Sequence, residues 1–138
     1  MKAKNLKAVI EKGSDGGYSI YLPEAPGMYG AGWTEEEAKE NLAENIEAVL
    51  QHSTETGVCD KDYKVFESPY ELEYAYDFSG FFKTFDMFDV TKLAKSLGIN
   101  ASLMRRYKLG YSVVSEKQRF RIEGGIHSLA GQLAQVRF

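Results

Sequence analysis

The sequence predicts an α+β fold in two parts, a mixed strand-and-helix domain followed by a purely helical domain. Residues 1–78 contain short apolar runs separated by glycine and proline, together with one long amphipathic helix, in the order β-β-β-α-β. From Val90 to Phe138 the apolar residues instead recur at helical spacing. We therefore expect a boundary near residues 78–80, with domains at 1–78 and 79–138.

The charge of the chain is divided in a similar way. Residues 1–89 hold 8 Lys and 18 Asp or Glu, a net charge of −10, whereas residues 90–138 hold 9 Lys or Arg and 2 Glu, a net charge of +7. A basic segment attracts polyanions, and an acidic segment is repelled by nucleic acid. The two halves are therefore expected to bind partners of opposite charge.

The composition is that of a folded protein without a membrane segment. A hydrophobic content of 43% in 138 residues is enough for a packed core. No apolar run is long enough to span a bilayer, and no signal-peptide pattern follows Met1. Because Cys59 is the only cysteine, no disulfide can form within the chain. We expect a cytoplasmic protein without a membrane partner.

The first domain is expected to open with a β-hairpin. Leu6–Ile10 is apolar and Tyr18–Leu22 alternates, and the glycine-rich residues 13–17 between them suit the positive φ of a tight turn. Tyr18 and Tyr21 would point to opposite faces of their strand, so one of them should be exposed.

A third strand and a helix are expected to follow the hairpin. Met28–Trp33 predicts the strand, and Thr34 with Glu37 forms a capping box that begins the helix. The apolar residues of a helix of roughly 16 residues then follow at helical spacing: Ala38, Leu42, Ile46, Val49 and Leu50. Tyr63–Phe66 and Leu72–Phe78 are predicted to be further strands.

The second domain is expected to be helical throughout. A short helix would pack the aromatic residues Phe81, Phe82, Phe85 and Phe88. Longer helices are predicted at Val90–Leu97, Ala101–Lys108 and Ser115–Val136. Gly124-Gly125 inside the last helix costs about 1 kcal/mol per glycine and indicates close packing or a kink.

The segment Val90–Leu109 carries the pattern of a helix-turn-helix. Ala94 is small where two helices would meet, and Gly98 supplies the positive φ of the turn. Asn100 or Ser102 can cap the second helix. The apolar wedge between the helices would consist of Leu93, Leu97, Ile99, Met104 and Tyr107. This pattern matches phage-repressor-like DNA-binding domains, and a helical bundle with a solvated basic face is the alternative.

In such domains the N-terminal residues of the second helix lie nearest the base edges of DNA. The candidates for base contacts are Asn100, Ala101, Ser102, Arg105 and Arg106. The candidates for phosphate contacts are Lys92, Lys95, Lys108, Lys117, Arg119 and Arg121. Because one helix reads only a few base pairs, we expect a homodimer or higher homo-oligomer on a palindromic site, joined by the last helix and residues 132–138.

Several short motifs follow one another in the first domain: Asp15-Gly16-Gly17-Tyr18, Leu22-Pro23-Glu24, Pro26-Gly27, Gly32, Thr34, Glu37-Ala38 and Asn41-Leu42. In this order they resemble the HicB family of antitoxins. Trp33 departs from the family pattern, in which the residue before the threonine is usually small or polar. The resemblance covers residues 5–50 well and 51–78 weakly, and the helix-turn-helix matches the DNA-binding tail of many family members.

The resemblance implies a degenerate RNase H-like first domain that is not an enzyme. It implies that this domain binds and blocks a small basic mRNA-cleaving toxin, similar to HicA, and that the second domain represses its own operon by binding double-stranded operator DNA. Exposed aromatic rings and a glutamate-rich helix face are the candidate toxin contacts: Tyr18, Tyr21, Tyr29, Trp33, Glu35, Glu36, Glu40, Glu44 and Glu47.

Two other functions remain open. One is a solitary helix-turn-helix transcription regulator whose first domain senses a ligand or a protein. The other is a metal-dependent nuclease, which needs several carboxylates around two metal ions. The available carboxylates are Glu11, Asp15, Glu47 and Asp77, but no Asp stands in the middle of the first strand. His52, His127 and Cys59 have no partners at catalytic or metal-ligand spacing, so neither a metal nor a cofactor is expected.

Overall fold

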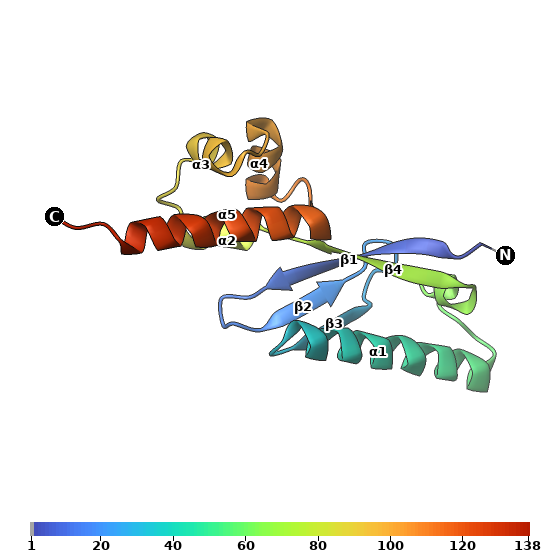
Figure 1. Ribbon diagram of the computed structural model, residues 1–138. Coiled ribbons are helices and arrows are strands. Elements are labelled where there is room, and N and C mark those ends of the chain that lie inside the picture. The colour runs from blue at the N-terminus through green and yellow to red at the C-terminus, as the bar shows by residue number, and fades with distance from the viewer. Residues whose placement is uncertain (1) are drawn as a thin grey trace. The chain divides into compact units, whose positions relative to one another are not determined.

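The computed structural model describes residues 2–138 and divides the chain into two compact units, one ending at Ala75 and the other formed by Tyr76–Phe138. The predicted α+β class, with strands and one helix followed by further helices, is confirmed (Figure 1). The N-terminal unit holds 7 Lys and 15 Asp or Glu, a net charge of −8. The C-terminal unit holds 10 Lys or Arg and 5 Asp or Glu, a net charge of +5.

The N-terminal unit is a mixed sheet covered on one face by a long helix (Figure 1). Its strands are β1 (Lys4–Lys12), β2 (Tyr18–Tyr21), β3 (Tyr29–Gly32) and β4 (Tyr70–Tyr76), in the spatial order β3-β2-β1-β4. The helix is α1 (Glu35–Thr56), and the 3₁₀ helix η1 (Lys64–Glu67) precedes β4. β1 pairs with β2 and β2 with β3 in antiparallel fashion, whereas β4 runs alongside β1 in the same direction.

The helix α1 packs directly on the backbone of β3. A Cβ atom at Gly30 would overlap the carbonyl oxygen of Ala38 and the backbone of Leu42. A Cβ atom at Gly32 would likewise overlap the backbone nitrogen of Ala38. Ala38, Leu42 and Ile46 are buried on this side of the helix, against Ile20 of the sheet. Glycine is therefore required in β3 because any side chain would push the helix away from the sheet.

The start of α1 is fixed by the predicted capping box. The Thr34 side chain accepts a hydrogen bond from Glu37 N at 3.0 Å, and Glu37 Oε2 in turn accepts one from Trp33 N at 2.8 Å. The helix continues to Thr56, ends at Gly57 with φ of 70°, and is 22 residues long rather than about 16. The cap thus locks the short connection between β3 and α1.

Two asparagines of α1 cover the free edge of β3, the last strand of the sheet. Asn41 Oδ1 accepts a hydrogen bond from Ala31 N at 2.9 Å, and Asn45 Nδ2 donates one to Tyr29 O at 2.7 Å. Residues four apart lie one above the other on a helix, so the two amides satisfy two successive edge groups. They protect the edge from pairing with another strand.

The prediction of a strand at Tyr63–Phe66 is wrong, because residues 64–67 form η1. Asp60 accepts a hydrogen bond from Tyr63 N and starts a turn there. Tyr63 and Phe66 are three residues apart, which is the period of a 3₁₀ helix, and Phe66 packs edge-on against Tyr70 at 5.2 Å. Tyr63 and Val65 also alternate as in a strand, so a run this short fits both structures.

The C-terminal unit contains the predicted helix-turn-helix. Its elements are α2 (Ser79–Thr84), α3 (Val90–Leu97), α4 (Ala101–Leu109), the two-residue strand β5 (Val114–Ser115) and α5 (Glu116–Ala134). Gly98 lies in the turn with φ of 69°, and Asn100 caps α4 by accepting a bond from Leu103 N. The buried residues of the wedge are Leu93, Ala94, Ile99, Met104 and Tyr107.

The two glycines inside α5 differ in their surroundings. A Cβ atom at Gly125 would collide with the Leu97 side chain of α3, whereas Gly124 has open space around it. The expected close packing therefore holds for one of the two positions. The apolar residues of α5 run from buried Ile122 to Leu133, which is 58% exposed. Among residues 2–138, no helix is long and apolar enough to cross a membrane.

Gly30→Ala is expected to destabilise the N-terminal unit by about 3 kcal/mol, the upper end for overpacking, because the added methyl meets backbone atoms that cannot move aside. Ala31→Val is the control, since Ala31 is exposed and lies on the opposite face of the same strand. Urea unfolding followed by circular dichroism and by the emission of Trp33, the only tryptophan, measures both. Equal midpoints for the two variants would contradict the tight contact.

Asn41→Ala and Asn45→Ala are each expected to cost about 1 kcal/mol, because each removes one hydrogen bond to β3. The double variant should also self-associate, since the strand edge loses its cover. Glu44→Ala on the exposed side of the same helix serves as control. Light scattering of concentrated samples checks this, and a monodisperse double variant would show that the edge needs no cover.

Candidate nucleic-acid and protein interfaces

The helix α4 presents a basic face to solvent. Met104 and Tyr107 are buried on its inner side, so the exposed outer side carries Ser102 and the predicted cations. These cations are Arg105, Arg106 and Lys108. Two of the predicted base-contact residues at the start of the helix are less available to DNA than these cations. Ala101 is half-buried, and the side-chain oxygen of Asn100 accepts the capping hydrogen bond.

Arg105 is held between the two helices of the motif. Its Nη1 donates to Thr91 Oγ1 in the first turn of α3 at 3.0 Å, and its Nη2 donates to Ser102 Oγ in the first turn of α4 at 3.2 Å. A guanidinium carries five N–H donors in one plane, so donors remain for a ligand. The two hydroxyls fix the plane of the guanidinium before any ligand binds.

Arg106 is directed toward the other end of α4. Its Nε donates to Ser112 Oγ at 2.9 Å, in the loop that follows the helix. The two neighbouring arginines therefore diverge, although the sequence places them side by side. Lys108 lines a depression of about 350 Å³ together with Arg105, Thr91 and Asp89, and Lys92 and Lys95 are exposed on α3.

The cationic side chains of α5 differ in how many contacts they make within the protein. Lys117 is exposed. Arg119 Nη1 lies 3.1 Å from Glu123 Oε2, and its guanidinium stands 4.5 Å from the Tyr76 ring and 4.7 Å from the Phe120 ring. Arg121 donates from Nη2 to the carbonyl of Gly98 in the turn of the motif. Arg119 and Arg121 thus have structural partners within the C-terminal unit, which the sequence does not reveal.

The candidate toxin contacts of the N-terminal unit fall on two faces. Tyr21 pairs in register with Tyr29, so both point to the side of the sheet away from α1. Tyr18 faces the other side, 5.4 Å below Lys12 Nζ. The glutamates lie along α1, where Glu35 is half-buried and the others are exposed: Glu36, Glu40, Glu44 and Glu47. The sheet separates the tyrosine pair from the glutamate face, so one flat partner surface cannot cover both.

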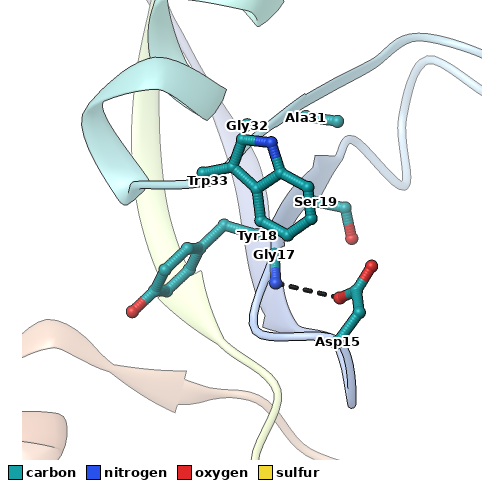
Figure 2. A pocket seen from close by; sticks show the side chains of 8 residues that line it. Asp15, Gly17, Tyr18, Ser19, Ala31, Gly32 and Trp33 are labelled. Atoms are coloured by element: carbon teal, nitrogen blue, oxygen red, sulfur yellow. Dashed lines mark hydrogen bonds between the residues drawn. The ribbon is translucent and has the colours of Figure 1, made fainter.

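A depression of about 530 Å³ lies at the end of the sheet where the hairpin turn meets the start of α1. Figure 2 shows the Trp33 indole on one side of it and the Asp15 carboxylate on the other. Its lining residues are Gly13, Asp15, Gly17, Tyr18, Ser19, Ala31, Gly32 and Trp33. Asp15 is a lining residue that the sequence did not indicate as a protein contact.

The carboxylates considered for a nuclease lie on different elements. Glu11 is on β1, Asp15 in the hairpin turn and Glu47 on the exposed face of α1, whereas Asp77 Oδ1 accepts a bond from Ser79 N at 2.9 Å. Within residues 2–138, no three His, Cys, Asp or Glu side chains come together in a way that could hold a metal ion.

The remaining candidates from the sequence are two histidines and one cysteine. His52 and His127 are exposed. Desolvation, the largest cause, and neighbouring Glu67 raise the pKa of the Cys59 thiol, although Ser53 opposes this with a hydrogen bond. A raised pKa lowers the thiolate fraction at neutral pH, and the thiolate is the reactive form of cysteine.

Comparisons with known proteins identify the family. No family model matches the chain, and no solved structure matches it significantly. The UPF0150 protein ssl0738 of Synechocystis sp. is 44% identical over 55 residues, which make up 40% of this chain and 75% of that protein. With three quarters of the relative covered at this identity, the chain belongs to the UPF0150 family, the HicB-like family.

Proposed function

We propose that this protein is an antitoxin that blocks a small, basic, mRNA-cleaving toxin with its N-terminal unit and represses its own operon with its C-terminal unit. The observation that carries the proposal is the opposite charge of two compact units, −8 and +5. The acidic unit suits a basic protein, and the basic unit carries a helix-turn-helix with arginines on its exposed face. Membership in a HicB-like family supports the same assignment.

The geometry of α3 and α4 supports operator binding. A helix-turn-helix inserts its second helix into the major groove, with the N-terminal part of that helix at the base edges. Arg105, with its plane fixed by Thr91 and Ser102, suits bidentate contact with guanine. Lys92, Lys108 and Lys117 would contact phosphates, which position the protein without reading sequence.

Two copies are needed for an operator of ordinary length, because one recognition helix reads only a few base pairs. The second half of α5 suits this contact. Its apolar side chains continue at heptad spacing beyond the packed Ile122, through Ile126 and Leu129 to the exposed Leu133. The exposed Val136 follows just after the end of the helix. We infer a homodimer joined by this part of α5.

Toxin inhibition requires binding and no catalysis by the antitoxin. The N-terminal unit would cover the active site of the toxin in a stoichiometric complex, with its net charge of −8 speeding the encounter with a basic partner. We propose that the chain itself is not an enzyme and needs no cofactor for this role.

Co-expression with the product of the adjacent gene tests this function. A neighbouring reading frame for a small basic protein should arrest growth when expressed alone, and the full chain should restore growth and co-purify with it. A chain expressed from the same promoter with a stop codon after Lys12 is the control. The absence of any such neighbour, or arrest that the chain does not relieve, would favour a solitary transcription regulator.

Arg105→Ala is expected to weaken binding to the operator by about 1–3 kcal/mol and to relax the preference at one base pair, because we propose that Arg105 contacts a base. Lys117→Ala should weaken binding to all sequences alike and lower the slope of log K against log salt by about 1. Fluorescence anisotropy with duplexes from the upstream region of the gene measures both.

The same titrations decide whether Arg106, which is bonded to Ser112, contacts a base or a phosphate. If Arg106→Ala lowers the preference for the operator over other DNA sequences, Arg106 contacts a base. If Arg106→Ala lowers the affinity for all DNA sequences equally, Arg106 contacts a phosphate. If the wild-type chain shows no salt-dependent affinity for DNA, the assignment of the C-terminal unit is wrong.

A further inference from the structure

We infer that the depression between Trp33 and Asp15 is a binding site for an arginine side chain of a basic protein partner. The inference deepens the proposed function and rests on it in one respect, namely that the natural partner is the toxin. The site itself is defined by the N-terminal unit alone, since its lining residues all lie between Gly13 and Trp33.

The aromatic wall of the site is open. Trp33 is 69% exposed, although large aromatic side chains are normally placed where they bury surface. Its backbone N–H is fixed by Glu37 Oε2 at 2.8 Å, so the indole projects from an anchored position. The other ring of the depression, Tyr18, already has Lys12 Nζ 5.4 Å from its centroid and points away from Asp15 (Figure 2). The face that remains for a ligand is therefore that of Trp33.

The opposite wall carries a fixed negative charge. Asp15 is exposed, and its Oδ1 accepts a hydrogen bond from Gly17 N at 2.9 Å within the hairpin turn. This bond holds the carboxylate in place and leaves its second oxygen for a ligand. A ligand that neutralises the carboxylate does not need to break the turn.

The floor of the depression is free of long side chains. It is formed by two glycines, a serine and an alanine at the ends of β2 and β3: Gly17, Ser19, Ala31 and Gly32. The volume of about 530 Å³ lies in the range of pockets that hold a drug-sized ligand. An inserted side chain can therefore reach between the indole and the carboxylate together with part of its own backbone.

An electron-rich indole face beside a carboxylate selects a cation. Cations are attracted to the face of tryptophan, and a guanidinium can stack on the ring while it pairs with a carboxylate in the same plane. The ammonium of lysine lacks the planar surface for stacking. Phosphates and nucleic acids are disfavoured by Asp15 and by the net charge of −8 on this unit. Arginine fits both walls of the site.

The emission of Trp33 provides a direct measurement, because it is the only tryptophan of the chain. The full-length protein is titrated with nona-arginine and, separately, with nona-lysine. We expect saturable quenching or a spectral shift with nona-arginine, and an apparent Kd several-fold higher with nona-lysine. Equal responses to the two peptides would show that only charge is sensed and would overturn the inference.

Two variants with the same change in net charge separate the site from the general acidity of the unit. Asp15→Asn keeps an oxygen acceptor for Gly17 N and should weaken nona-arginine binding about tenfold, the loss of one charge-assisted pair. Glu71→Gln, at an exposed position of β4 outside the depression, should leave binding nearly unchanged. Equal affinities for both variants would overturn the inference, and circular dichroism verifies that both remain folded.

Failure of the proposed function is recognised separately. If the adjacent gene product binds the wild-type chain, Asp15→Asn and Trp33→Ala should weaken that complex, and an unchanged affinity in both would overturn the inference. If the wild-type chain binds no such product, the antitoxin function is wrong, whereas the peptide titrations still decide whether the arginine site exists.

Discussion

The close approach of α1 to β3 is the contact on which the N-terminal unit depends. Gly30 and Gly32 let the helix rest on the strand backbone, and the cap between Thr34 and Glu37 fixes where the helix begins. Asn41 then uses the proximity to bond the strand edge. Because Trp33 lies between the last glycine and the cap, its position follows from the same contact.

The C-terminal unit depends on a comparable constraint, the tight turn at Gly98. This turn sets the angle between α3 and α4 and is held from α5 by Arg121, which bonds the Gly98 carbonyl. Part of the positive charge of this unit therefore has a structural role beside the proposed role in ligand binding. Arg105 combines the two roles, since it bonds both helices and retains further donors.

Features set by neighbouring residues could be predicted from the sequence. The helix at Val90–Leu97 and the cap at Thr34 depend on local periodicity and side-chain chemistry. The 3₁₀ helix at Lys64–Glu67 could not be predicted because its short aromatic run fits two periods. The separation of Tyr21 and Tyr29 from the glutamates depends on strand register, which no local pattern determines. The divergence of Arg105 and Arg106 depends on partners from distant parts of the chain.

Trp33 and the glutamates of α1 carry different weight as evidence for a protein partner. A surface helix needs charged residues on its outer face whether or not anything binds there, so Glu36, Glu40 and Glu44 are explained by solvation alone. Neither the cap nor the core needs an indole at position 33, because the cap uses only its backbone N–H and the ring is mostly exposed. A ligand that covers the ring would offset the hydrophobic cost of that exposure. The indole, more than the negative charge, is therefore the feature of the N-terminal unit that supports the proposed partner.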